Sequence, residues 1–125
     1  MPYTINIGAF TQDTINALNI NPLDPAHAIS ANGAIDPHTP GRYCISKAGV
    51  AALTLGAPLS GTEDGIQITV YSDTAFAHTI TATGLFADGA GHVNLCTFAA
   101  QIGAQAVLMS RKGLWYATGT GVTYS

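Results

Sequence analysis

The sequence predicts an all-β protein, an antiparallel β-sandwich of the jelly-roll type preceded by an extended N-terminal arm. Three observations predict this fold. After Pro40-Gly41, short runs alternate between apolar and polar residues with a period of two, as half-buried strands do. Turn dipeptides such as Asp64-Gly65 separate these runs. No helical period of useful length follows residue 40, so we expect one β-domain at 41–125.

Residues 1–40 differ from the rest of the chain, because they contain five of its six prolines. Residues 11–18 could form one or two helical turns with Thr11 as the cap. The NPLDP cluster at 21–25 ends any such helix, since proline lacks the amide donor. Residues 26–39 show no period. We therefore expect 1–40 to be an extended arm ordered by another chain, with wrapping around its own domain as the alternative.

Several large apolar residues lie in this arm, although an isolated extended segment cannot bury them. Such side chains gain nothing unless a partner covers them. The arm is therefore predicted to bind another protein through Tyr3, Ile5, Ile7, Phe10, Ile15 and Leu18.

The β-domain is predicted to contain eight strands in chain order. They are Arg42–Lys47, Val50–Leu55, Ile66–Ser72, His78–Thr83, Val93–Phe98, Ala104–Arg111, Leu114–Thr118 and Val122–Tyr124. The third run places Ile66, Ile68 and Val70 on one face. With the fourth it predicts a central antiparallel hairpin, joined by a turn at 73–76. A second hairpin is predicted at 110–117, where Gly113 takes the left-handed position of a short Arg-Lys-Gly turn.

The composition excludes several functions. Hydrophobic residues make up 47% of the chain and charged residues 9%, with four Lys plus Arg and a net charge of −3. A nucleic-acid interface needs a basic patch, which this sequence lacks. No run approaches the apolar length of a transmembrane helix, so no membrane partner is expected. The N-terminus lacks signal-peptide features, which favours folding in a reducing cytoplasm.

The sequence shows no catalytic, metal or cofactor motif. Cys44 and Cys96 are expected to be buried free thiols, with a disulfide as the alternative. The four histidines lack the spacing of zinc ligands, and His78 is interpreted as a hydrogen-bonded packing residue. The adjacent acids Glu63 and Asp64 fit a turn better than paired acid–base catalysis. We therefore predict a protein that is not an enzyme and has no cofactor.

Trp115 and Tyr116 are neighbours on one predicted strand and must face opposite sides. If one is in the core, the other is an exposed aromatic that could anchor an interface or stack on a sugar ring. The alternative is that a neighbouring loop buries both.

Two runs carry a resemblance to known proteins. They are PGRYCISKAGVAALTLGAPLSGTEDGIQITVYSDTAFAHTITATGLF and TFAAQIGAQAVLMSRKGLWYATGTGVTYS. The segment 40–125 resembles small head decoration, or cement, proteins of tailed bacteriophages. The resemblance implies a structural protein on the outer capsid surface of the virion, made in the host cytoplasm. It implies the major capsid protein as partner and self-association, with a trimer favoured over a dimer. The alternative is a receptor- or carbohydrate-binding module of a head or tail fibre.

Overall fold

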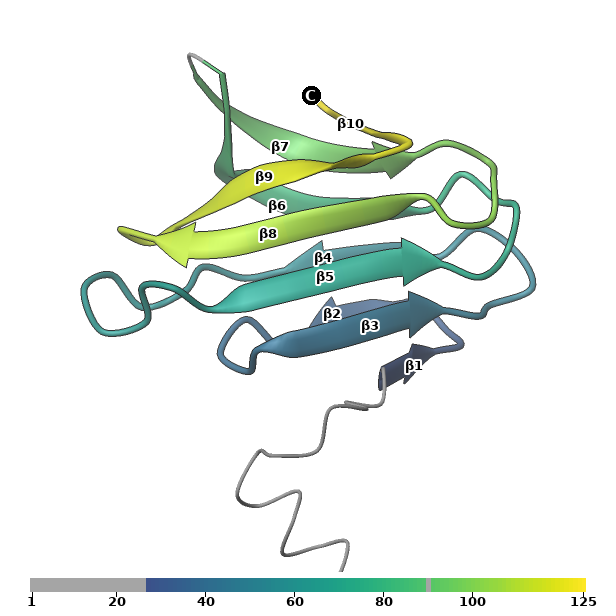
Figure 1. Ribbon diagram of the computed structural model, residues 1–125, viewed down its shortest axis with the longest axis horizontal. Helices are drawn as coiled ribbons and strands as arrows, with labels where there is room; N and C mark the ends of the chain where they lie inside the picture. Colours follow the sequence, from purple (N-terminus) through teal and green to yellow (C-terminus); the bar gives the residue numbers. More distant parts are fainter. Residues whose placement is uncertain (1–26, 90) are drawn as a thin grey trace, which may run out of the picture.

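The computed structural model describes residues 27–89 and 91–125, which form ten strands and no helix (Figure 1). This confirms the all-β prediction. The strands are β1 His27–Ile29, β2 Gly33–Ile35, β3 Gly41–Ile45, β4 Ala52–Leu55, β5 Gln67–Ser72, β6 Thr79–Asp88, β7 Gly91–Phe98, β8 Gln105–Arg111, β9 Leu114–Thr120 and β10 Val122–Tyr124. The eight strands predicted from the sequence correspond to β3–β10.

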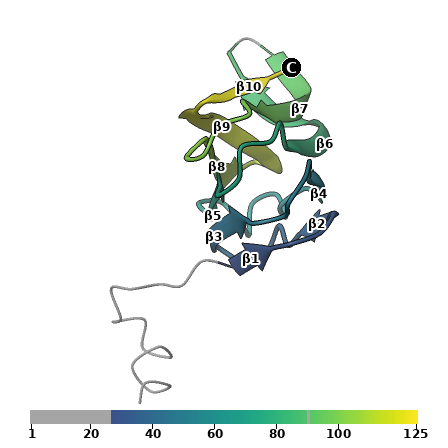
Figure 2. The ribbon, with the colours of Figure 1, turned by 90° about the vertical axis from the view of Figure 1, so that its right-hand side faces the viewer.

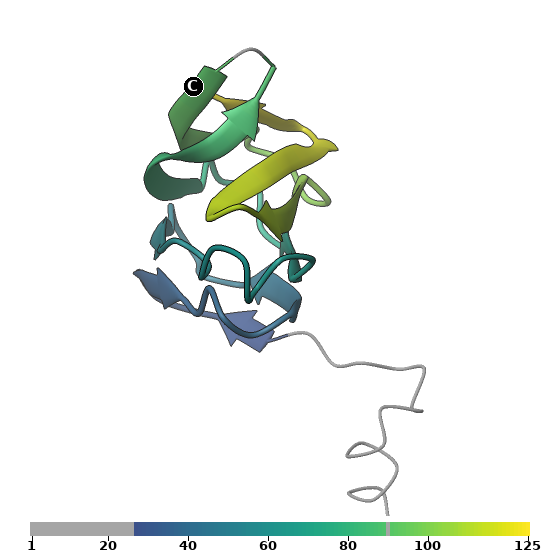
Figure 3. The same cartoon turned by 90° about the vertical axis from the view of Figure 1, so that its left-hand side faces the viewer.

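The strands form one curled sheet with the order β1-β3-β5-β8-β9-β6-β4-β2, and β7 pairs with both β6 and β10. The curl brings two walls face to face (Figures 2 and 3). One wall contains β1, β3, β5 and β8, and the facing wall contains β2, β4 and β6. The core lies between the walls.

The expectation of a purely antiparallel sheet is wrong. β3 runs parallel to both β1 and β5, and β4 runs parallel to both β2 and β6. β6 and β9 are parallel as well. Up to β6, successive strands alternate between the walls, so neighbours within a wall are two strands apart in the sequence and point the same way. This topology is a curled mixed sheet, and it does not confirm a sandwich or jelly roll.

The predicted central hairpin is also wrong, although both of its strands exist. β5 pairs with β3 and β8, whereas β6 pairs with β4, β7 and β9. The connection 73–78 carries the chain from one wall to the other. Backbone hydrogen bonds hold its start, from Asp73 N–H to the carbonyl of Ile45 and from Gly103 N–H to the carbonyl of Ser72. These bonds fix the connection at the end of the core, so the two strands never meet.

The sequence predicts that residues 27–40 belong to the arm. In the structure this segment lies on the domain and contains β1 and β2. Ile35 is buried in the core. The Asn32 side chain anchors the link between the two strands, because its Oδ1 accepts hydrogen bonds from Lys47 Nζ and from the backbone N–H of Ala52, both at 2.9 Å. For these residues the structure matches the alternative that the segment wraps its own domain. Residues 1–26 lie outside the described residues.

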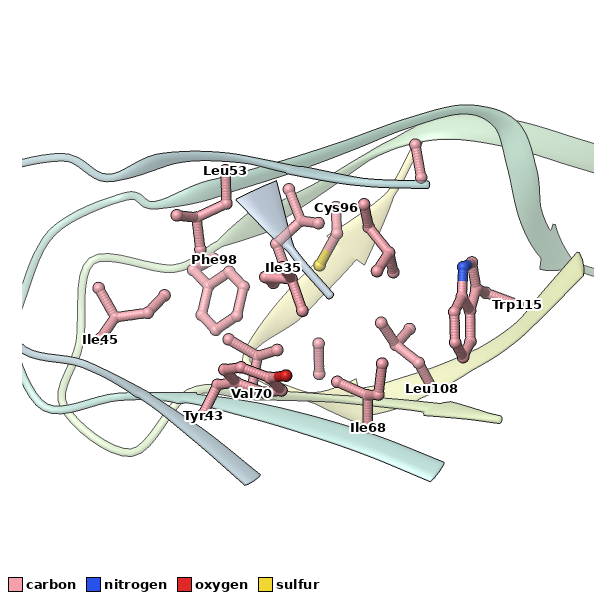
Figure 4. Close-up of a cluster of buried hydrophobic side chains, with 14 of the residues drawn as sticks. Ile35, Tyr43, Ile45, Leu53, Ile68, Val70, Cys96, Phe98, Leu108 and Trp115 are labelled. Atoms are coloured by element: carbon pink, nitrogen blue, oxygen red, sulfur yellow. The ribbon is translucent and has the colours of Figure 1, made fainter. Parts of the chain in front are cut away.

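The core contains the apolar faces predicted from the alternation. Ile68 and Val70 of β5 are fully buried, and Ile80 of β6 is buried in the opposite wall. Figure 4 shows ten labelled core side chains, contributed by both walls and by β7, β8 and β9. They are Ile35, Tyr43, Ile45, Leu53, Ile68, Val70, Cys96, Phe98, Leu108 and Trp115. Each large side chain buried in this way stabilises the fold by roughly 1.5–3 kcal/mol.

The predicted hairpin at 110–117 is confirmed. β8 and β9 are antiparallel, with Arg111 opposite Leu114. The two-residue turn has positive φ at both positions, 53° at Lys112 and 76° at Gly113, as a type I′ turn requires. The turn fixes the register of the hairpin and therefore which side chains face outward.

Candidate interaction surfaces

The predicted arm contacts fall before the described part of the chain. Tyr3, Ile5, Ile7, Phe10, Ile15 and Leu18 all lie in residues 1–26, so their contacts remain predictions. The structure does show where this segment joins the domain. His27 opens β1, which pairs within the described residues only with β3. The chain thus enters the domain at an edge of the sheet.

The end of the fold near β1 and β2 contains a cavity, and none of the residues that line it is charged. A cavity of about 250 Å³ is lined by residues 28–35 together with Tyr43 and Leu53. Within the described residues, β2 pairs only with β4, so this end presents two strand edges. Edges of this kind are templates for strand addition, and residues 27–35 contain no Lys or Pro that would blunt them.

Trp115 is excluded as an exposed contact, which corrects half of that prediction. Its side chain is fully buried, and its indole Nε1 donates a hydrogen bond of 2.8 Å to the carbonyl oxygen of Gly56. The side chain fills the core between the walls and anchors the loop that leads from β4 to β5. Its role in the fold is structural.

Tyr116 faces outward, as the alternation of facing residues requires. Its side chain is 47% exposed, and Met109, directly opposite on β8, is exposed to the same extent. A hollow of about 440 Å³ lies beside them, lined also by Asp64, Arg111 and Lys112. Sequence reasoning missed Met109 and Arg111. The sequence did contain a signal for Met109. A two-residue turn at 112–113 sets the register of the hairpin and therefore pairs residue 109 with residue 116.

The loop from β4 to β5 borders this hollow and is held by its acidic residues. The Glu63 carboxylate accepts hydrogen bonds of 2.7 Å from the backbone N–H of Leu59 and from His38 Nδ1. The hydrogen bond from Leu59, followed by that from His38, lowers the pKa of Glu63. Asp64 Oδ1 accepts a hydrogen bond from the backbone N–H of Lys112 at 2.9 Å. The adjacent acids therefore order a turn, as predicted.

The buried titratable groups serve packing. His78 is fully buried and hydrogen-bonded through both ring nitrogens, as predicted. Cys96 is buried and free, as expected, and burial raises its pKa to about 12. Cys44 is also free but only partly buried, because its side chain lies on the outer face of β3, which corrects the expectation that both thiols are buried. Over the described residues, no three His, Cys, Asp or Glu side chains gather as metal ligands would. In the same part of the chain, no helix is long and apolar enough to cross a bilayer.

No family model matches the chain, and no curated protein matches it significantly. The resemblance of 40–125 to phage decoration proteins therefore stays a prediction, and the function is argued below from the surfaces.

Proposed function

We propose that the protein is a non-enzymatic structural protein of a phage virion. It binds the outer surface of the capsid and cements neighbouring major capsid subunits. The observation that carries most weight is the position of the arm. Residues 1–26 join the domain at β1, on the sheet edge, next to the cavity that is lined by uncharged residues. An arm attached there can continue onto a partner while the domain stands above it.

The mechanism is burial of the arm's apolar side chains along the shell. Ile5 and Ile7 alternate with Thr4 and Asn6, which suits an extended strand added to the edge of a partner's sheet. Each large side chain buried in this way contributes roughly 1.5–3 kcal/mol. Modest affinity per copy is enough, because a lattice presents many sites and bridging two subunits makes the second contact intramolecular.

Self-association is part of the same proposal. A closed trimer is favoured over a dimer, since the resemblance implies a trimer and closed symmetry is the rule for homo-oligomers. Sedimentation equilibrium of the free protein distinguishes the two assemblies. The protein is made in the host cytoplasm and then occupies the capsid surface.

The decisive experiment measures occupancy on capsids that lack this protein. Deleting residues 1–12 should leave the melting midpoint of the free domain unchanged. Capsid occupancy should fall by orders of magnitude, and the capsids should lose their added heat resistance. A finer version replaces Ile5 and Ile7 with Ser and uses Ser at Thr4 and Asn6 as the matched control. Full occupancy by the truncated protein would refute the mechanism.

A second candidate is a receptor- or carbohydrate-binding module of a head or tail fibre. The exposed Tyr116 beside a hollow favours it, because such a side chain presents an apolar ring with a polar tip. Binding would then reside in the β-domain and survive deletion of residues 1–12.

A further inference from the structure

Met109 and Tyr116 stand out among the exposed side chains. Among the described residues, they are the only exposed large hydrophobics that lie in strands, since the others are in connecting segments. They are cross-strand neighbours in the β8–β9 hairpin. Its pairing runs from Gln105 opposite Thr120 to Arg111 opposite Leu114. Their backbone positions are therefore fixed by the sheet. A contact surface held this way is present before any ligand arrives.

Tyr116 also separates two hollows on this face. The first, of about 440 Å³, extends toward the hairpin turn. The second, of about 310 Å³, is lined by Ala87, Gly89, Gly91 and His92. Both volumes are in the range of small-ligand sites. The glycines leave backbone groups accessible, so this second hollow is mainly polar.

The hairpin turn adds positive charge beside the ring. Arg111 and Lys112 are two of the chain's four cations, and both line the first hollow. Their side chains make no ion pair or hydrogen bond with any residue that the structure describes. Asp64 is the acidic residue in the lining, and one of its oxygens is occupied by the backbone N–H of Lys112. Two cations against one carboxylate leave this hollow positive in a chain of net charge −3.

We propose that this face binds an acidic saccharide. The C–H face of a sugar ring stacks on Tyr116, with Met109 extending the apolar contact. The sugar carboxylate is held by Arg111 and Lys112, since the planar guanidinium fork matches carboxylate geometry. This inference names the ligand class of the second candidate function and rests on that candidate. It requires no contact with a capsid.

Other occupants fit less well. A stable protein interface buries about 800 Å² on each partner, and two exposed apolar side chains do not provide its centre. A polyphosphate backbone would bring many negative charges toward a chain that is itself acidic, with only two nearby cations to neutralise them. A single carboxylate on a stacking ring suits both the apolar and the charged parts of this face.

The test is an NMR titration of the full chain with sialyllactose, which carries one carboxylate, and with lactose as the neutral comparison. Sialyllactose should shift the amides of residues 109–116 and bind more tightly than the neutral sugar. Tyr116→Phe keeps the ring and should retain the affinity. Tyr116→Leu keeps the apolar volume without the ring and should weaken binding about tenfold. Arg111→Gln should also weaken it about tenfold, while Arg42→Gln on β3 should not.

The contrary outcomes are equally concrete. Equal affinity for the two sugars, or unchanged binding in Arg111→Gln or Tyr116→Leu, would overturn the assignment. So would failure of oligogalacturonate, hyaluronan fragments and sialyllactose alike to bind the folded chain. If no sugar binds while Tyr116→Leu dissociates a self-associated form in sedimentation, the face is an interface between copies. Because the titration needs no capsids, its failure leaves the cementing proposal standing, and loss of capsid binding leaves this inference standing.

Discussion

His78 Nδ1 accepts a hydrogen bond of 3.0 Å from the backbone N–H of Ala51, which joins the crossing connection to the start of β4. The opposite ring nitrogen, Nε2, lies 2.9 Å from Thr74 Oγ1. Because Nδ1 is an acceptor, the imidazole is neutral and its proton is on Nε2. The buried ring thus holds together two segments that cross between the walls.

This arrangement predicts a loss of stability in mild acid. Burial lowers the pKa of His78 below its usual value of 6.5. A hydrogen bond with the backbone of Thr74 partly opposes this shift, and nearby Lys47 lowers the pKa further. Above about pH 6.5 the ring is neutral in both states. Below that pH the unfolded chain binds a proton that the folded chain does not, so the free energy of unfolding falls. Urea unfolding between about pH 7 and pH 5 measures this decline.

Replacing His78 distinguishes its contribution to the pH dependence of stability from the contributions of other titrating groups. His78→Asn should cost about 1–3 kcal/mol by leaving the Ala51 N–H unpaired, and should flatten the decline above pH 5. His92→Asn, at an exposed histidine, is the matched control and should change neither property. The lowered pKa values of Asp36 and Glu63 also reduce stability in acid, but only below about pH 3.8 for Asp36 and about pH 4.5 for Glu63. An unaltered pH profile in His78→Asn would contradict the assignment.

The two faces of β5 should respond oppositely to charge. Ile68→Asp places a carboxylate in the core and should cost about 3 kcal/mol or more. Thr69→Asp lies on the outer face, in register with Arg42, and should be nearly neutral. Thermal unfolding compares the two variants, and similar melting points would show that the facing assignment is wrong.

Gly113 and Gly119, in the turn and in β9 of the β8–β9 hairpin, should differ in their tolerance of an added methyl group. At Gly119 an added Cβ would overlap the backbone carbonyl of Gln105 and lie 2.7 Å from Val122 Cγ2. We expect Gly119→Ala to cost about 3 kcal/mol, since the sheet fixes that carbonyl. At Gly113 the methyl would meet Ser60 Cβ at 3.5 Å, an ordinary contact, so only the positive φ opposes it, at about 1–2 kcal/mol. Chemical denaturation of both variants tests the order.

The two thiols should differ in reactivity. Burial raises the pKa of both, but Cys96 is fully buried and Cys44 is partly exposed on the outer face of β3. The thiolate is the reactive species, so iodoacetamide at about pH 8 should modify Cys44 slowly and spare Cys96 until the protein unfolds. Mass spectrometry of digested protein follows each site over time. Equal modification rates in the folded protein would argue that β7 opens readily.

The strands were predictable because alternation reports burial, and burial of one face is a local property of each strand. Ile68, Val70 and Ile80 illustrate this. Strand partners were not predictable in the same way. A short connection such as 73–78 can close a hairpin or cross the core. The choice depends on Ile45 and Gly103, which are distant in sequence and bind the start of the connection.

The strands β1 and β2 were missed because each has only three residues, and half of these six residues are Gly or Ala. Their pairing is set by β3, β4 and the Asn32 side chain. The candidate sugar site was predictable in part. The strand period alone predicted that Trp115 and Tyr116 face opposite sides. Which of the two is exposed depends on which face of β9 packs against the core, and that requires the tertiary structure.

The placement of β1 and the C-terminus at opposite ends of the domain has a practical consequence. β1 lies at one end of the domain, and the C-terminal residue lies near β7 and β10 at the other (Figures 1 and 2). Ser125 is held there by its backbone N–H, which donates to the carbonyl of Leu95 at 2.8 Å. A second folded domain fused after Ser125 would therefore project away from the end through which the arm attaches. If that end faces a capsid, the chain is a display scaffold whose cargo points into solvent.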